Sequence, residues 1–176
     1  MKYSFYLLGF ICLTSQSFAQ SNTREAPEYP WLNQKFPVDQ FVSFEGDSSL
    51  LFQSDNIYIL SFWYSSCPPC LAEIPTLNKL KEDFKGQKIR FLAITFDSQE
   101  EWSQFLVLQP FDFEHFQMDR NFINQNRLAY GYPTNLLLDA KGIVRYQKSG
   151  GHTNPEKAWQ VYDLMKEEIY KVLGEG

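Results

Sequence analysis

The sequence has little of what metal sites and nucleic-acid surfaces are built from. Its 176 residues include three cysteines and two histidines, and acidic residues outnumber basic ones by 21 to 16, for a net charge of −5. Surfaces that bind nucleic acid or anionic lipid carry an excess of positive charge, so we expect no nucleic-acid partner. The sequence also has no internal repeat and no low-complexity tract, so nothing indicates a repeat architecture.

What is present suffices for one domain with a substantial core. Hydrophobic residues make up 44% of the chain and aromatic residues 17%, with phenylalanine present in 16 copies. This length fits one domain with flanking segments. We assign residues 37–176 to the domain and the polar, proline-containing residues 20–36 to a lead-in.

The N-terminus has the pattern of an export signal. Lys2 is followed by an uncharged apolar stretch and then by the polar segment TSQSFAQ. Ser17 and Ala19 occupy the positions that a signal peptidase recognises, so we expect residues 1–19 to be removed. An uncleaved membrane anchor is the alternative, but the apolar stretch has about half of the roughly 20 residues that span a bilayer.

Cleavage would leave a single, close pair of cysteines. Cys12 would leave with the signal, and Ile11 before it is not the small residue of a lipoprotein site. Loss of Lys2, the one charged residue of the signal, would change the net charge from −5 to −6. We therefore expect an exported, soluble periplasmic protein whose remaining cysteines are Cys67 and Cys70.

Buried-strand patterns alternate with helical ones along the domain. Residues 57–63 and 89–96 are continuous apolar runs, as in buried strands. Residues 71–84 carry apolar side chains at helical spacing, with Pro75 expected to kink the helix and Gly86 to stop it. Ser98 and Glu101 form a capping-box signature ahead of a second helix.

The remaining elements complete an α/β pattern. We expect a strand pair within 38–53, a short strand at 113–119, a short helix at 120–130, two strands within 134–147 around a turn at 140–142, and a last helix that Asn154 caps and Pro155 starts. Strands that alternate with helices and end in a hairpin and a helix favour a mixed central sheet with helices on both faces.

The stretch FWYSSCPPC, residues 62–70, places two cysteines at a junction of strand and helix. At the N-terminal edge of the helix, unpaired N–H groups and the helix dipole favour the thiolate of Cys67. We expect its sulfur to be exposed and to attack, and Cys70, one turn further in, to resolve the mixed disulfide. Pro68 and Pro69 remove two N–H donors, which makes the thiolate less stable and the pair more reducing.

Two other interpretations of the cysteine pair remain open. A structural disulfide this short would close a tiny loop and constrain the unfolded chain little. A zinc or copper site would need two further ligands, and His115 and His152 lie in different segments. We favour a redox-active pair and expect no metal and no cofactor.

Two motifs together resemble the active site of the thioredoxin superfamily. They are FWYSSCPPC and the segment GYPT at residues 131–134. More narrowly, the signal segment, CPPC followed by Glu73-Ile74-Pro75, the segment TFDSQEEW and the segment GYPTNLLLDAKGIV resemble the exported TlpA/ResA-like thioredoxins. The resemblance implies a thioredoxin-like three-layer sandwich and a thiol–disulfide oxidoreductase.

The resemblance also implies roles for single residues. Pro133 matches a cis-proline that faces the cysteines and joins them as a candidate catalytic residue. Tyr132 matches the residue whose backbone pairs with a substrate strand. The candidate substrate-binding residues are Trp63, Pro68, Pro69 and Tyr132, with Trp63 expected mainly to pack beneath the site.

The chain departs from thioredoxin in how it could handle protons. Ser61 and Ser66 stand where thioredoxin has a buried acid, six residues before the first cysteine, and a tryptophan just before it. Glu73 matches a glutamate that approaches the active site in ResA-like proteins. We expect Glu73 to tune or relay the proton of the cysteine pair; the alternative is an exposed glutamate that favours the helix dipole.

Three functions are consistent with the sequence. The first, implied by the resemblance, is a reductant of disulfides in exported client proteins that a membrane-bound thiol donor recharges. The second is a thiol peroxidase, which usually needs Thr or Ser and Arg near the thiolate, and the chain has no Thr-x-x-Cys. The third is a metal carrier or binding module on the same scaffold, because a fold does not prescribe a function.

Overall fold

The computed structural model describes residues 29–43, 48–52 and 55–174. The predicted signal, residues 1–19, and the first part of the predicted lead-in lie outside the described residues. Within the described ranges, every helix is too short or too polar to cross a bilayer.

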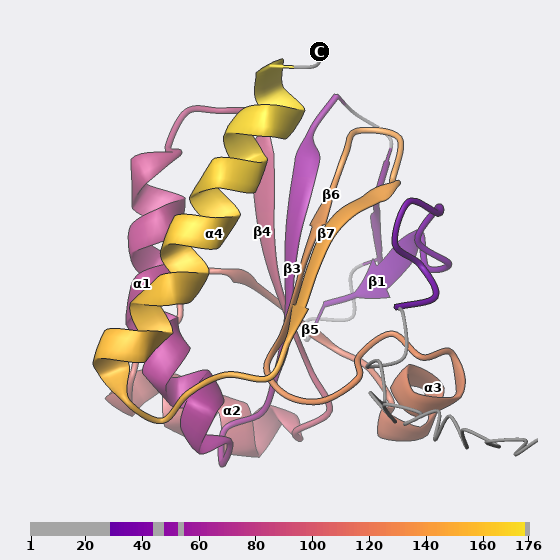
Figure 1. The fold of residues 1–176 in the computed structure, drawn as a ribbon. Helices are drawn as coiled ribbons and strands as arrows, with labels where there is room; N and C mark the ends of the chain where they lie inside the picture. Colours follow the sequence, from indigo (N-terminus) through magenta and orange to yellow (C-terminus); the bar gives the residue numbers. More distant parts are fainter. Residues whose placement is uncertain (1–28, 44–47, 53–54, 175–176) are drawn as a thin grey trace, which may run out of the picture.

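A five-stranded mixed sheet forms the centre of the fold, in the order β5-β4-β3-β6-β7 (Figure 1). Its strands are β3 (Ile57–Trp63), β4 (Ile89–Thr95), β5 (Glu114–Gln117), β6 (Thr134–Leu138) and β7 (Val144–Ser149). β3 pairs in parallel with β4 and antiparallel with β6. All seven residues of β3 are buried, as its apolar run predicts for a central strand.

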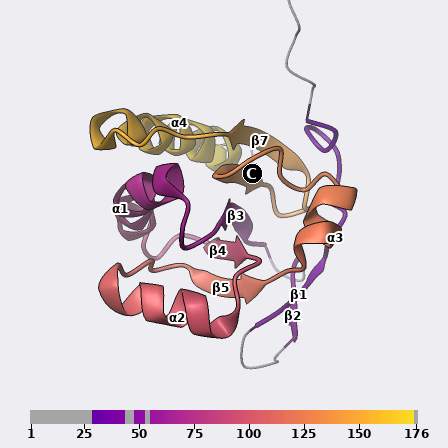
Figure 2. The ribbon, with the colours of Figure 1, turned by 90° about the horizontal axis from the view of Figure 1, so that it is seen from below.

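Helices cover both faces of the sheet (Figure 2). One face carries α1 (Pro68–Asp83), α2 (Gln99–Leu108) and α4 (Pro155–Gly174), and the other carries α3 (Arg120–Gln125) and the hairpin of β1 (Gln40–Val42) and β2 (Ser48–Leu50). The side chains of β3 alternate between two apolar cores. Ile59 and Trp63 belong to the core under α1 and α4, while Leu60 and Phe62 belong to the core under α3. The expected three-layer α/β sandwich is confirmed.

Part of the predicted lead-in packs against the sheet. Tyr29 and Phe36 are buried in the core under α3. The Tyr29 hydroxyl donates a hydrogen bond to the Leu128 carbonyl at 2.8 Å, and Leu32 forms a bridge with Val144 at the start of β7. Residues from Tyr29 onward therefore contribute to the core of the fold.

α1 continues through Pro75 as a single helix. Proline has no N–H, so the carbonyl of Leu71, four residues earlier, loses its partner within the helix. The side-chain amide of Gln109, at the end of α2, donates to that carbonyl at 2.9 Å. A contact between two helices thus offsets part of the cost of a proline inside one of them.

The helix predicted at residues 120–130 is shorter than expected. α3 ends at Gln125, and Asn126 caps it. Arg127 has a φ of +51°, which lies in the left-handed region and cannot continue a right-handed helix. The sequence carried no glycine or proline before this point to indicate the stop.

The caps predicted for α2 and α4 are confirmed. Ser98 and Glu101 satisfy each other's backbone N–H groups in a complete capping box. Asn154 accepts a hydrogen bond from the Glu156 N–H at 2.8 Å, directly before Pro155 begins α4. Both helix starts are therefore fixed by local sequence.

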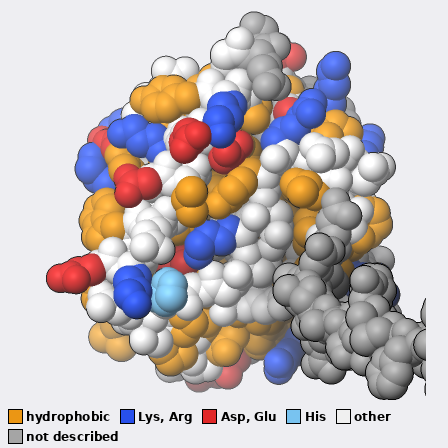
Figure 3. Space-filling view, viewed as in Figure 1, with side chains coloured by type: hydrophobic (Ala, Val, Ile, Leu, Met, Phe, Trp, Pro, Cys, Tyr) orange, Lys and Arg blue, Asp and Glu red, His pale blue; other side chains and the backbone are white. Residues whose placement is uncertain are grey.

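The molecular face in Figure 3 carries charges of both signs. Lys and Arg side chains are interspersed there with Asp and Glu, and apolar side chains lie between them. On the described part of this face neither positive nor negative side chains form a continuous patch.

The contact of β3 with β6 should contribute strongly to the stability of the sheet. Leu60 and Leu136 are cross-strand partners, and both are fully buried. We expect Leu136→Ala to lower the free energy of unfolding by about 2–5 kcal/mol, because it leaves a cavity in the core. Urea denaturation measures the change. Leu108→Ala, at a site that is 86% exposed, should change it by less than about 0.5 kcal/mol, and equal effects would contradict the prediction.

Candidate functional site

The two cysteines lie where β3 runs into α1. Cys67 is the N-cap of α1, and Pro68 and Pro69 occupy the first helical positions, which need no backbone N–H. The Cys67 carbonyl accepts the Leu71 N–H at 3.0 Å and so starts the helical hydrogen bonds. The sequence therefore predicted the place of the pair correctly.

Cys67 and Cys70 are joined by a disulfide, with their Cα atoms 5.2 Å apart. The Cys70 N–H donates to the Cys67 sulfur at 3.3 Å. The two prolines between them have no N–H to offer. The pair is thus described in its oxidised form, with one backbone donor from within the motif on the N-terminal sulfur.

The prediction of an exposed Cys67 sulfur is wrong for this oxidised form. Cys67 and Cys70 are 1% and 2% exposed, and both belong to the apolar core that contains Trp63. Ser66 and Pro68, on either side of Cys67, are exposed. The disulfide therefore lies just below the surface, and a partner thiol needs a local opening of this loop to reach it.

A cis peptide bond joins Tyr132 to Pro133 directly before β6, as the resemblance implies. The register pairs Phe62 with Thr134, so Pro133 lies next to the end of β3 that leads into the cysteine loop. The rings of Tyr64 and Tyr132 lie 5.4 Å apart, edge to face, and join the two segments. Pro133 and the cysteines therefore share one edge of the sheet, the edge that Figure 2 views from below.

An aromatic cluster of Tyr64, Phe96 and Tyr132 lies at this edge. Each ring centroid is 5.2–5.4 Å from the other two, and the Arg120 guanidinium lies 4.7 Å from the centre of the Phe96 ring. All three rings are partly exposed. Sequence reasoning missed Tyr64 and Phe96, although each directly follows one of two parallel strands, whose carboxyl ends meet at one edge.

Trp63 supports the site from below. It is 1% exposed and packs against Phe105 and Phe111, with ring centroids 5.2 and 5.4 Å away. Trp63 is therefore not accessible to a substrate in this form. Of the two prolines proposed for substrate contact, Pro68 is exposed and Pro69 is half-buried.

Glu73 is buried, so its interpretation as an exposed glutamate of the first turn is wrong. Its side chain is 1% exposed. One carboxylate oxygen accepts a hydrogen bond from the Asn135 amide at 2.8 Å, and the other accepts one from the Lys148 ammonium at 3.3 Å. Burial raises the pKa of Glu73, and the nearby Lys148 and the Asn135 hydrogen bond oppose the rise.

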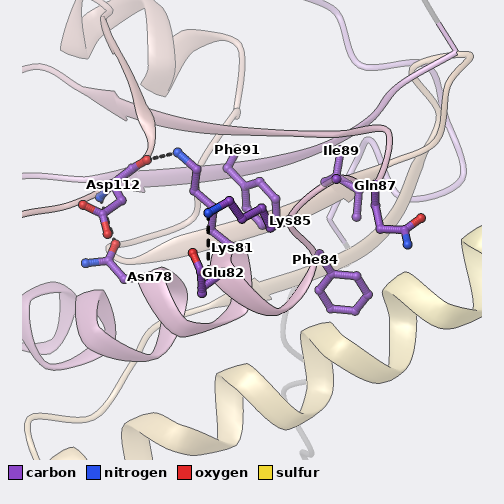
Figure 4. A pocket seen from close by; sticks show the side chains of 10 residues that line it. Asn78, Lys81, Glu82, Phe84, Lys85, Gln87, Ile89, Phe91 and Asp112 are labelled. Atoms are coloured by element: carbon purple, nitrogen blue, oxygen red, sulfur yellow. Dashed lines mark hydrogen bonds and ion pairs between the residues drawn. The ribbon is translucent and has the colours of Figure 1, made fainter.

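A pocket of about 420 Å³ lies far from the cysteines, at the opposite end of α1 (Figure 4). Phe84, Ile89 and Phe91 line it, and its lysines are engaged: Lys81 donates to the Asp112 carbonyl and Lys85 pairs with Glu82. α1 has 16 residues and is about 24 Å long, and the pocket lies along its last turns. The cysteine pair is therefore outside this cavity.

Comparisons with known proteins agree with the geometry of the site. A sequence profile of the AhpC/TSA family matches residues 45–147, more than half of the chain. The chain belongs to the AhpC/TSA family. It is 29% identical over 112 residues to the thioredoxin-like protein YneN of Bacillus subtilis, which covers 62% of this chain and 65% of YneN. It is 28% identical over 116 residues to the thiol-disulfide oxidoreductase ResA of Halalkalibacterium halodurans, which covers 62% of each.

These matches span just under two thirds of the length of the relatives. A crystal structure from Chlorobium tepidum, assigned as the thiol:disulfide interchange protein DsbE, superposes with a TM-score of 0.68 over 81% of this chain and 97% of that one, at 22% identity. The expected thioredoxin-like fold is thereby confirmed.

Gly151 allows the loop after β7 to approach the site closely. A Cβ at this position would lie 2.7 Å from a carboxylate oxygen of Glu73 and 3.0 Å from the Pro133 ring. We expect Gly151→Ala to displace Glu73 from its partners and to lower the free energy of unfolding by about 1–3 kcal/mol. Thermal or urea unfolding tests this. Gly174→Ala, where a Cβ would meet nothing within 4 Å, is the control, and a similar loss there would contradict the prediction.

Proposed function

We propose that the protein is a thiol–disulfide oxidoreductase that reduces disulfides in exported client proteins through Cys67 and Cys70. The observation that carries the proposal is the disulfide at the head of α1, beside the strand that Pro133 precedes. The similarity to the thioredoxin-like protein YneN and to the thiol-disulfide oxidoreductase ResA supports it. The predicted signal supports an exported, periplasmic site of action, and the resemblance supports a membrane-bound thiol donor.

The proposed reaction moves two electrons from the dithiol to the client. The Cys67 thiolate attacks one sulfur of the client disulfide, and the other client sulfur leaves as a thiolate that takes up a proton. Glu73 accepts the proton of Cys70, whose thiolate then attacks the Cys67 sulfur. The second client sulfur leaves and is protonated, and the disulfide described above forms. A donor dithiol reverses these steps, becomes a disulfide and restores the reduced pair.

The edge that holds the cysteines suits an extended client segment. In the proposed complex, the backbone of Tyr132 pairs with the client strand next to its disulfide, and Pro133 keeps that strand against the cysteine loop. Tyr64 and Phe96 provide the apolar rim on which client side chains rest. Arg120, stacked over Phe96, adds a positive charge to that rim.

Pro69 should make the pair reducing. An N-cap side chain commonly accepts from the N–H of the second or third helical residue. Here the third, Cys70, donates to Cys67, and the second, Pro69, cannot. A thiolate with one such donor is less stable, which favours the disulfide.

We expect Pro69→Ala to add the missing donor and to shift the reduction potential by about 30 mV toward the oxidising side. Equilibration with glutathione or dithiothreitol buffers, followed by alkylation of free thiols, measures the potential. Pro68→Ala adds an N–H at the first helical position, away from the sulfur, and serves as the matched control. A wild-type potential near −120 mV, about the oxidising extreme for such pairs, would contradict the assignment as a reductant.

The order of attack can be tested by trapping. We expect Cys70→Ala to accumulate mixed disulfides between Cys67 and client proteins, because the resolving thiol is gone. Mass spectrometry of the adducts after expression in an exported compartment identifies the clients. Cys67→Ala should form none, and equal trapping by both variants would overturn the roles assigned to the two sulfurs.

The other two functions predict different behaviour. A thiol peroxidase would consume hydrogen peroxide in a reaction that Cys67→Ser abolishes. A metal carrier would bind Cu(I) or Zn(II) stoichiometrically in its reduced form without reducing disulfides. Among residues 29–43, 48–52 and 55–174, no three His, Cys, Asp or Glu side chains gather in a way that could hold a metal ion.

A further inference from the structure

A row of polar side chains crosses the face of the sheet beneath α1. The register pairs Ser61 of β3 with Asn135 of β6, and Asn135 with Lys148 of β7. The neighbouring row on the same face is apolar and consists of Ile59, Leu137 and Tyr146. Polar residues on adjacent strands of a buried face are unusual unless they have partners. Asn135 and Lys148 have Glu73 as their partner, which α1 places over the row.

Lys148 is the cation that contacts this carboxylate. Its ammonium lies 3.3 Å from a Glu73 oxygen, and its side chain is 22% exposed while that of Glu73 is 1% exposed. A buried carboxylate without an opposite charge is strongly disfavoured in its ionised form. Lys148 therefore reaches from the surface to offset the charge of a group that water hardly touches.

The same ammonium is tied to the backbone next to the cis-proline. Lys148 also donates to the Gly150 carbonyl at 2.9 Å, and the Gly150 N–H donates to the Pro133 carbonyl at 2.8 Å. Gly151 follows and lies against both Glu73 and Pro133. One side chain thus connects the buried acid with the segment proposed to bind the client.

We propose that Lys148 is the positioning residue for proton transfer: it holds the Glu73 carboxylate ionised and in place to accept the proton of Cys70. Cys70 and Glu73 are three residues apart on α1 and so lie on one face of the helix. This inference rests on the proposed function. It assigns to β7, almost 80 residues after Cys70, a part in the second step of the exchange.

Among the charged groups around Glu73, Lys148 has the largest effect on its pKa. Burial raises the pKa of Glu73, the charge of Lys148 is the largest opposing influence, and His152 in the loop after β7 opposes the rise more weakly. Tyr146 of β7 faces the same region, and burial chiefly, with Glu168 of α4 and Glu73, raises its pKa. The contribution of Glu73 to stability is greatest below its ordinary pKa and is lost as the pH rises through the raised pKa.

The variant Lys148→Met removes the charge and keeps an apolar stem of similar length. Lys148→Arg restores the charge, and Lys141→Met removes a lysine from the exposed turn at the other end of the same hairpin. Carbon-13 NMR of protein with labelled glutamate measures the pKa of Glu73. Comparison with the variant Glu73→Gln assigns the signal of Glu73. The reduction of insulin by each variant, with dithiothreitol as donor, is followed from pH 5 to 9.

We expect Lys148→Met to raise the pKa of Glu73, to move the rising part of the rate profile to higher pH and to slow reduction at pH 7 about tenfold. Lys148→Arg should restore both within about threefold, and Lys141→Met should change neither. Should Lys148→Met not fold, as urea titration would show, Lys148→Gln gives the same comparison.

Two results would overturn the role of Lys148. One is an unchanged pKa of Glu73 in Lys148→Met. The other is an equal loss of rate in Lys148→Met and Lys148→Arg with the pH profile unmoved, which would mean that Lys148 acts through folding alone. A wild-type protein that reduces no insulin at any pH would refute the proposed function, while the NMR comparison would still decide whether Lys148 controls Glu73.

Discussion

The antiparallel register between β3 and β6 is the constraint on which the site depends. It pairs Phe62 with Thr134, which sets Pro133 beside the cysteine loop, and Ser61 with Asn135, which sets an amide under Glu73. A shift of one residue would turn every side chain of β6 to the opposite face. Asn135 would then leave Glu73, and the buried Leu136 would leave its core. Apolar packing thus fixes the place of each polar group in the site.

The same register sets a carboxylate near the strand position at which thioredoxin carries a buried acid. Ser61 occupies that strand position, and its cross-strand partner Asn135 binds the carboxylate of Glu73. The carboxylate therefore lies over the same row of the sheet, but the helix supplies it. The small side chain of Ser61 is compatible with a Glu73 carboxylate that lies over this row of the sheet. Lys148 and Asn135 then offset the cost of burying the charge.

Much of this architecture follows from local sequence, and the rest depends on distant contacts. The apolar runs gave β3 and β4, the capping box gave the start of α2, and the resemblance gave the fold and the cis bond before β6. The local sequence did not indicate the burial of Glu73, because this burial depends on Lys148 and Gly151, far along the chain. The passage of α1 through Pro75 depends likewise on Gln109. Local patterns predict elements, whereas the environment of a titratable group is set by the segments that fold over it.

The burial of the oxidised pair places a condition on its reductant. The loop before Cys67 is held by Asp97, whose carboxylate accepts the Ser65 N–H at 2.6 Å and whose own carbonyl accepts from Gln117. These are a few hydrogen bonds at an edge with exposed neighbours, so opening this loop costs far less than unfolding the domain. A small thiol such as dithiothreitol reacts only while the loop is open, because it binds nothing at this edge that would offset the cost. A protein donor that bound the aromatic rim would offset part of it, so the edge proposed to bind clients should also favour the thiol proposed to recharge the pair.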